Sequence, residues 1–151
     1  MITIDEFKNK ITKKSRLLGL DLGSKRIGVA ISDDLLSIAT PFKTINKEST
    51  IQFIDELKLI IKENNIKGII VGNPINMDGS LSRKSQSVKD ICKNILKCIN
   101  VPICLWDERL STVGAFNLSS QLDENISKKV KNIDKNAAAF ILQGAIDYLK
   151  N

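Results

Sequence analysis

The chain has 151 residues, of which 42% are hydrophobic, enough for one domain with a substantial core and too few for two. Its 23 lysines and arginines outnumber 17 acidic residues, and the resulting charge of +6 suits a polyanionic partner such as nucleic acid. The sequence contains no histidine, which excludes Ser-His-Asp catalysis, Cys-His catalysis and histidine-ligated metal sites. Carboxylates, lysines, arginines and hydroxyls must therefore perform any chemistry.

No part of the sequence has the pattern of a membrane or secreted protein. Nothing approaches about 20 consecutive apolar residues, and the first residues carry no apolar run of secretory length. The three cysteines, Cys92, Cys98 and Cys104, lie in apolar surroundings without CxxC spacing, which indicates reduced core residues. We therefore expect a cytoplasmic protein with no membrane partner.

We expect the chain to consist of an N-terminal extension, 1–15, and a single domain, 16–151. In the extension, Ile4, Phe7 and Ile11 recur at helical spacing among lysines, which fits either a short docked helix or a basic arm. The domain then opens with the stretch LLGLDLGSKRIGVAISD at 17–33, which predicts a strand, a tight turn and a second strand.

Asp21 is the unusual residue of this hairpin. Strand alternation places three leucines on one face and Asp21, between Gly19 and Gly23, on the other. A carboxylate inside an apolar strand is costly unless a partner satisfies it, and the glycines leave room for a ligand to approach. Two interpretations stay open here: a ligand site, or a core hairpin whose aspartate accepts backbone hydrogen bonds.

The remaining pattern is strand and helix in alternation. We expect a third strand at 37–47 with Pro41 at an edge or bulge, and a helix from the Ser49 cap to about 64. The inward stripe of that helix is expected to be Ile51, Ile54, Leu57 and Ile61. Further elements are a buried strand at 67–72, a loop at 73–80, a helix at 83–100, a strand at 103–107, a marginal helix from 111 or 112 to 122, a polar segment of no clear period at 123–135, and a last helix from 134 to 149. A meander followed by alternating helices and strands predicts a mixed α/β layer fold.

Acidic residues meet the predicted core in two further places. Asp107 and Glu108 end the strand at 103–107, at the edge where open α/β sheets place ligand sites, and alternation sends them to opposite faces. The alternative for this pair is a solvated loop with an ion pair to Arg109. Asp134 begins a helical series of apolar residues on the core-facing stripe, and it is equally suited to be the N-cap of that helix.

Together these acids suggest a metal site. Two strand-borne carboxylates and one from a helix on the same sheet supply the hard oxygen ligands that Mg²⁺ or Mn²⁺ binds. Two such ions about 4 Å apart activate a water and stabilise the leaving oxygen of an in-line displacement, which needs no histidine base. Basic residues available to hold a phosphate backbone are Lys25, Arg26, Arg83, Lys84, Lys128, Lys129 and Lys131.

Four motifs in this order resemble the YqgF/RuvX family: LGLDLGSKRIGVAISD, VGNPINMDGS, DERLST and IDKNAAAFILQ. That family is described both as Holliday junction resolvases and as pre-16S rRNA nucleases. The resemblance covers about 17–149 and implies an RNase H-like fold, a five-stranded mixed sheet flanked by helices, in which a three-strand antiparallel meander is joined by parallel strands. It also implies hydrolysis of phosphodiester bonds with a divalent metal, Mg²⁺ or Mn²⁺.

Transferred residue by residue, the resemblance points to Asp21, Glu108 and Asp134 as catalytic metal ligands. It assigns substrate contacts to Lys25, Arg26, Asn76, Asp78, Ser80, Arg109, Ser111 and Thr112. Asp78-Gly79 is equally suited to a simple turn. Related junction resolvases carry two acids one helical turn apart at the last position, whereas this chain has Ala137 three residues after Asp134.

The resemblance favours a nuclease that processes the 5′ end of precursor 16S rRNA in ribosome biogenesis, acting as a monomer or homodimer. The first alternative is a Holliday junction resolvase acting on branched DNA. A non-catalytic RNA-binding assembly factor is the second. A third, a nucleotide-binding domain of the actin-like superfamily, is disfavoured because those proteins clamp ATP between two such domains and this chain has length for one.

Overall fold

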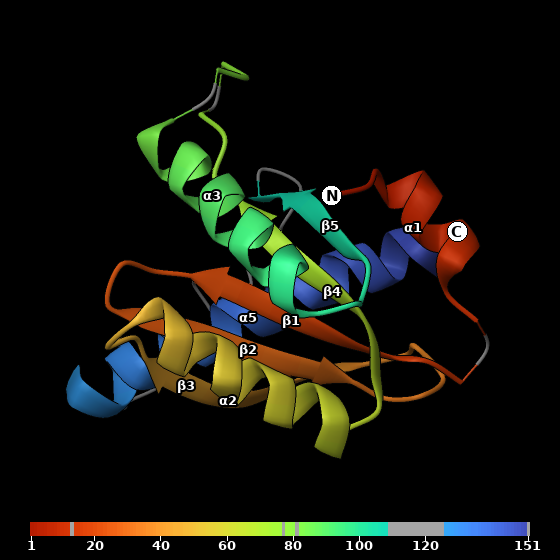
Figure 1. Cartoon of the computed structure of the whole chain (residues 1–151), viewed down its shortest axis with the longest axis horizontal. Coiled ribbons are helices and arrows are strands. Elements are labelled where there is room, and N and C mark those ends of the chain that lie inside the picture. The colour runs from red at the N-terminus through yellow and green to blue at the C-terminus, as the bar shows by residue number, and fades with distance from the viewer. Residues whose placement is uncertain (13, 77, 81, 109–125, 151) are drawn as a thin grey trace.

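The computed structural model describes residues 1–12, 14–76, 78–80, 82–108 and 126–150, the stretch 126–135 by its backbone alone. Its centre is a five-stranded sheet with the strand order β3-β2-β1-β4-β5 (Figure 1). The strands are β1 (Arg16–Leu22), β2 (Arg26–Ser32), β3 (Ala39–Asn46), β4 (Ile66–Asn73) and β5 (Ile103–Asp107). The pairs β1/β2 and β2/β3 are antiparallel, and β1/β4 and β4/β5 are parallel. The predicted mixed sheet with its three-strand meander is therefore confirmed.

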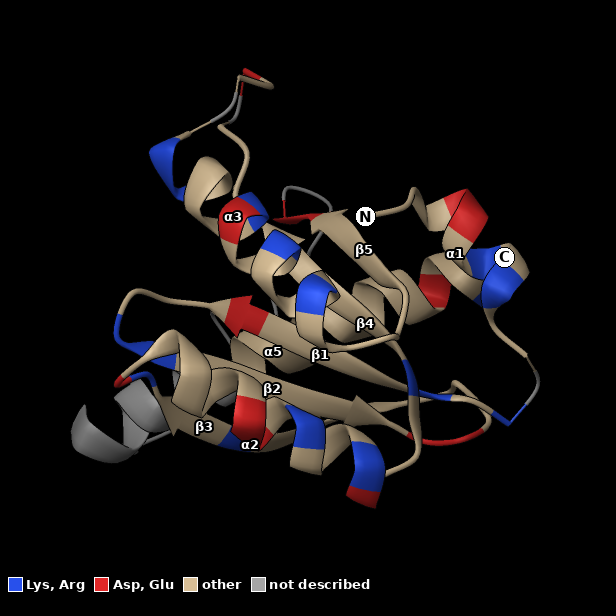
Figure 2. Ribbon diagram, in the orientation of Figure 1, with Lys and Arg blue, Asp and Glu red and all other residues tan. Residues whose placement is uncertain are grey.

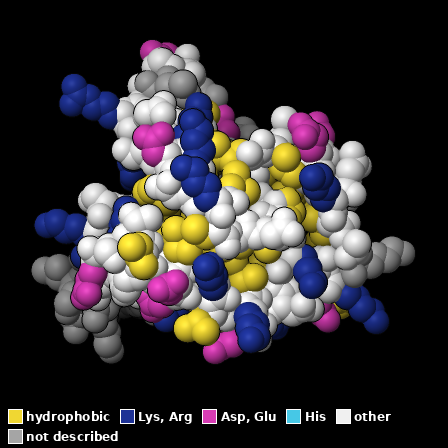
Figure 3. Space-filling model, in the orientation of Figure 1, with side chains coloured by type: hydrophobic (Ala, Val, Ile, Leu, Met, Phe, Trp, Pro, Cys, Tyr) yellow, Lys and Arg dark blue, Asp and Glu magenta, His cyan; other side chains and the backbone are white. Residues whose placement is uncertain are grey.

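Helices cover both faces of the sheet. Helices α2 (Thr50–Glu63) and α3 (Arg83–Cys98) pack on one face, and the long helix α5 (Ile126–Lys150) crosses the other (Figure 1). Lysine and arginine side chains are spread over the α2 and α3 side of the molecule (Figure 3). The N-terminal helix α1 (Ile4–Lys10) adds the fully buried side chain of Phe7 to the core on the α5 side. Within the described ranges, no helix combines the length and the apolar character needed to cross a bilayer.

The predicted alternation along β1 is confirmed. Leu18, Leu20 and Leu22 belong to the core beneath α2 and α3. Gly19 faces α5 so closely that a Cβ there would lie 2.7 Å from Leu142 Cβ. Because side chains two residues apart share a face, Asp21 lies on the α5 side of the sheet.

The third strand and the first sheet-covering helix match their predictions in most details. Strand β3 is an edge strand, and its register shifts around Phe42, next to Pro41. The Ser49 side chain caps α2 by accepting a hydrogen bond from the Gln52 backbone N–H. The predicted inward stripe was wrong in part, because Ile51 is 77% exposed. The buried stripe is Phe53, Ile54, Leu57 and Ile60. The orientation of α2 on the sheet thus buries the larger phenylalanine ring of Phe53 instead of Ile51.

The last helix begins earlier than predicted. Helix α5 starts at Ile126, so the predicted start at Asp134 was wrong, and the alternative that Asp134 is the N-cap of this helix is excluded. The preceding segment is rich in lysine, which has a high helix propensity and needs no apolar period to extend a helix whose later turns pack on the sheet. The marginal helix predicted for 111–122 falls outside the described residues.

Two of the three cysteines are core residues, as predicted. Burial raises the pKa of the Cys92 thiol to about 12 and that of Cys104 to about 11. Cys98 is exposed at the end of α3, so the prediction for it was wrong. Ile95 and Ile99 take the inward positions at that end of the helix.

Candidate active site

Two acidic residues lie where parallel strands end at the same edge of the sheet. Asp21 is one residue from the end of β1, half-buried and opposite Gly28 of β2. Glu108 directly follows β5. Since β1, β4 and β5 run parallel, their carboxyl ends meet at one edge, where Figure 2 shows acidic positions at the ends of β1 and β5.

Glu108 lies on the α5 face of the sheet, the face that carries Asp21. A Cβ added to Gly72 of β4 would lie 2.6 Å from Glu108 Oε1 and 2.5 Å from Cδ1 of Ile141 on α5. Along β5, Trp106 belongs to the core under α5, whereas Leu105 packs against the core on the α3 side. The structure thus separates the two adjacent acids and brings Glu108 to the side of Asp21.

The carboxylates of Asp21 and Glu108 are close enough to repel each other. Burial raises the pKa of Glu108, and the negative charges of Asp21 and Asp107 raise it further. The ammonium group of Lys84, in the first turn of α3, opposes these effects and lowers it. A half-buried carboxylate with another beside it favours a bound cation, which relieves both the desolvation and the repulsion.

The third predicted acid lies on the helix that covers this face. Asp134 is seven residues before Ile141 on α5, which corresponds to two helical turns. Its side chain falls outside the described part of the chain. Among the side chains that the structure does describe, no three acids or cysteines form a group able to hold a metal. Asp21 and Glu108 could offer two carboxylates to a metal ion, and any third protein ligand would come from beyond the described residues.

Comparison with known proteins identifies the family of the chain. Residues 15–148 match the model of the RuvX family, described as Holliday junction resolvase. The chain belongs to the RuvX family. A relative from Pelagibacter ubique (strain HTCC1062) is named "Putative pre-16S rRNA nuclease". It is 72% identical over 151 residues, which is the whole length of both chains. A second, from Rhodobacter capsulatus and of the same name, is 42% identical over 97% of this chain and 92% of its own.

A solved structure confirms the fold of this RuvX-family chain. T. thermophilus RuvC in complex with a Holliday junction substrate aligns with a TM-score of 0.58 and 12% sequence identity, covering 89% of this chain and 94% of RuvC. At that identity the likeness shows the fold alone, which is RNase H-like as predicted. The resemblance noted from the four sequence motifs is confirmed by the family match.

The loop between β4 and α3 forms a hydrogen-bonded turn. Asp78 Oδ1 accepts hydrogen bonds from the backbone N–H and the hydroxyl of Ser80, at 2.9 and 2.7 Å. Asn76 donates from Nδ2 to Ser80 Oγ at 3.0 Å, and Gly79 has φ 88°. The exposed side chains of Asn76, Asp78 and Ser80 therefore hold the loop between β4 and α3 in shape, which supports the alternative of a simple turn.

The start of α3 is anchored to the end of β4 by a contact that the sequence did not indicate. Ser85 Oγ donates to Asn73 Oδ1 at 2.7 Å, and both residues are buried. Ser82 caps the helix by accepting from the Ser85 backbone N–H. Because these bonds fix the first turn of α3, they also fix where Lys84 leaves the backbone. A serine and an asparagine twelve residues apart carry no pattern that would have revealed the pair.

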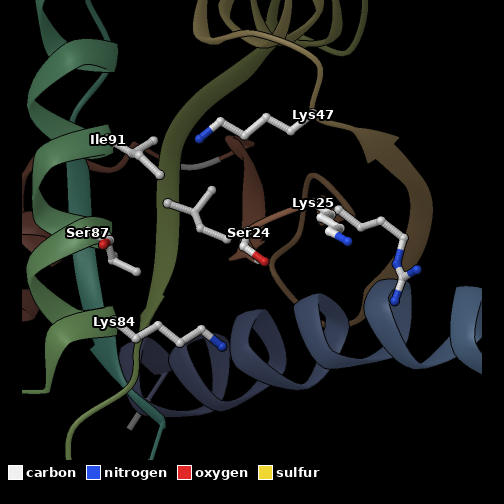
Figure 4. A pocket seen from close by; sticks show the side chains of 10 residues that line it. Ser24, Lys25, Lys47, Lys84, Ser87 and Ile91 are labelled. Atoms are coloured by element: carbon white, nitrogen blue, oxygen red, sulfur yellow. The ribbon is translucent and has the colours of Figure 1, made fainter.

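The basic hairpin turn faces a second group of positive charges. The Gly23 N–H donates to the carbonyl of Arg26 at 3.0 Å, and the Lys47 N–H donates to that of Lys25 at 2.9 Å. Lys25, Arg26, Lys47 and Lys84 line one pocket (Figure 4). Lys47 was not among the predicted contacts, since a lone lysine after an edge strand has no distinctive sequence signal. Arg109, Ser111 and Thr112 lie outside the described residues.

Proposed function

We propose that this chain is a divalent-metal-dependent nuclease that hydrolyses phosphodiester bonds of structured nucleic acid. The observation that carries the proposal is the closeness of Asp21 and Glu108 on one face of the sheet, where the charge of Asp21 raises the pKa of Glu108. Lys84 adds a positive charge beside the pair. The family match and the names of its relatives support the same activity.

The residues present fit Mg²⁺ or Mn²⁺. Carboxylate oxygens are the ligands that both ions prefer, and a bound cation would relieve the burial and the repulsion from Asp21 that raise the pKa of Glu108. Asp21 and Glu108 would hold the ion, with Asp134 of α5 as a third ligand. When bound, such an ion activates a water and stabilises the leaving oxygen. Lys84 would balance the charge of the phosphodiester, and the basic hairpin would hold the backbone on either side.

The substrate that we propose is the 5′ end of precursor 16S rRNA, processed in the cytoplasm during ribosome biogenesis. This choice rests on the names of the relatives, one of which matches over the whole of both chains. The second candidate is a Holliday junction, favoured by the description of the family. Symmetric cleavage of a four-way junction needs two active sites, so that candidate requires a homodimer, whereas rRNA processing is compatible with a monomer. Proposed substrate contacts include Lys25, Arg26, Asn76, Asp78, Ser80, Arg109, Ser111 and Thr112.

The test is cleavage of two end-labelled substrates, a precursor 16S rRNA 5′ end and a four-way DNA junction. Each is incubated with the wild-type protein in Mg²⁺, in Mn²⁺ and in EDTA, with Asp21→Asn protein purified in parallel to control for contaminating nucleases. We expect the metal ions to support cutting, EDTA to abolish it, and the RNA to be cut faster. Faster cutting of the junction would favour the resolvase. Binding without cutting of either substrate would contradict the nuclease proposal and favour an assembly factor.

A further inference from the structure

A pocket of about 680 Å³ opens beside the candidate active site, between the β1–β2 turn and α3. Its walls come from three separate parts of the chain: the end of β1 with the following turn, Lys47 after β3, and the first half of α3 (Figure 4). Lys47 and Lys84 extend into it from opposite sides, with Ser24 and Lys25 between them. A cavity of this size falls in the range that holds ligands as large as a nucleotide.

The lining of the pocket has two distinct chemical surfaces. One is positively charged, from Lys25, Arg26, Lys47 and Lys84, and none of the described lining residues is acidic. The other is aliphatic, from Leu22, Val88 and Ile91, with the hydroxyls of Ser24 and Ser87 alongside. Cations placed around one cavity repel each other unless an anion enters. An anion with an apolar part attached would match both surfaces.

The pocket adjoins the carboxylate pair through Lys84. This lysine lines the pocket, and its charge also lowers the pKa of Glu108. Asp21 precedes the lining residue Leu22 by one position, on the opposite face of β1. A phosphodiester bound at the carboxylates therefore lies beside Lys84, and the same strand can continue into the pocket that this lysine lines.

We propose that this pocket binds one unpaired nucleotide of the substrate strand, next to the bond that is cut. Its phosphate contacts Lys47 and Lys84, and its sugar and base lie against Val88 and Ile91. A base inside a duplex is stacked and paired and does not enter such a cavity, so the pocket selects substrates with an unpaired nucleotide beside the cut. The position of this nucleotide relative to the cut rests on the proposed nuclease function, whereas the binding of an unpaired nucleotide in the pocket does not.

The first test measures binding without catalysis. A fluorescent oligouridylate of about ten nucleotides is titrated with protein in EDTA at several salt concentrations and followed by anisotropy. We expect Lys47→Gln to weaken binding about tenfold and to lower the logarithmic salt slope by about 0.7, the value for one phosphate contact on a single strand. Lys62→Gln, an exposed lysine at the far end of α2, is the matched control and is expected to change neither.

The second test blocks the pocket without altering charge. Ser87 is exposed at the pocket, so Ser87→Trp fills space there at little risk to folding, and Asn94→Trp places the same side chain on an exposed position of α3 that does not line the pocket. We expect only Ser87→Trp to weaken oligouridylate binding, with melting temperatures of both variants close to wild type. A blunt RNA duplex is expected to bind both variants equally.

These outcomes separate the inference from the proposed function. The pocket proposal would be overturned, even if the protein cuts RNA, by either of two results. One is that Lys47→Gln and Lys62→Gln change oligouridylate affinity equally, and the other is that a folded Ser87→Trp protein binds oligouridylate like the wild type. Weaker oligouridylate binding by both Lys47→Gln and Ser87→Trp would support the pocket proposal even if no cleavage were found, because this measurement needs neither a metal nor cutting.

Discussion

Replacing Glu108 by glutamine is expected to slow metal-dependent cleavage by at least about 100-fold. Glutamine keeps the shape of the side chain and removes its negative charge, and losing about 3 kcal/mol of the metal-derived stabilisation of the transition state corresponds to that factor. Single-turnover cleavage with saturating protein measures the chemical step directly. Glu63→Gln, which changes an exposed glutamate at the end of α2, is the matched control and is expected to cleave like the wild type.

The same substitution is expected to leave the metal-free protein as stable as before or more stable. Burial and the charge of Asp21 raise the pKa of Glu108 in the folded state. A raised folded-state pKa means that the ionised form opposes folding, so stability is lost as the pH rises from the ordinary value of 4.5 through the raised pKa. Glutamine removes this loss. Thermal melts of the wild type and Glu108→Gln in EDTA at neutral pH test this prediction. A clear fall in the melting temperature of Glu108→Gln would indicate that Glu108 has a structural role instead.

Gly72→Ala is expected to damage both stability and cleavage. Its Cβ would lie 2.5 Å from Ile141 Cδ1 and 2.6 Å from Glu108 Oε1, so the added methyl group displaces α5, the carboxylate or both. Overpacking of this kind costs about 1–3 kcal/mol of the free energy of unfolding. Because metal sites depend on the positions of their ligands, we expect cleavage to fall about tenfold or more. Chemical denaturation and single-turnover cleavage measure the two effects.

A double variant separates the two parts of that effect. Ile141→Val removes the Cδ1 atom that meets the new methyl group and leaves Glu108 unchanged. In the Gly72→Ala/Ile141→Val protein we expect stability to recover in part and cleavage to stay low, because the contact with Glu108 Oε1 remains. Ile141→Val alone is the control. Recovery of cleavage together with stability would contradict the view that Gly72 keeps space for the Glu108 carboxylate.

The strand part of the fold follows closely from local pattern. Alternation in β1 correctly assigned the leucines to one face and Asp21 to the other, and in β5 it correctly sent Asp107 and Glu108 to opposite faces. Two-residue periodicity leaves little freedom, since a shift of one residue moves every side chain to the wrong face. The edge position of β3 also followed from one residue, Pro41.

Helix registers and helix starts were less predictable. A helical stripe is broad enough that Ile51 and Phe53 both fit its border, and only packing against the sheet decides which is buried. Asp134 has the chemistry of an N-cap, yet α5 begins eight residues earlier, because tertiary contacts along its later turns support the whole helix.

The two parts of the site also differ in how far the sequence reveals them. Asp21 and Glu108 stand out because carboxylates at the ends of apolar strands are unusual and need a reason. The pocket has no such local signal. Lys25, Lys47 and Lys84 are ordinary surface lysines in the sequence, and only the sheet topology, which brings the β1–β2 turn, the end of β3 and α3 together, makes them one group.

Asp21 and Glu108 are proposed to bind one divalent ion together, and Mn²⁺ titration tests this shared site most directly. Free Mn²⁺ is followed by electron paramagnetic resonance as the ion is added to metal-free wild-type protein, to Asp21→Asn, to Glu108→Gln and to the double variant. We expect the wild type to bind Mn²⁺, each single variant to bind it much more weakly, and the double variant to lose little more than either single one. Wild-type affinity in either single variant would contradict a shared metal site.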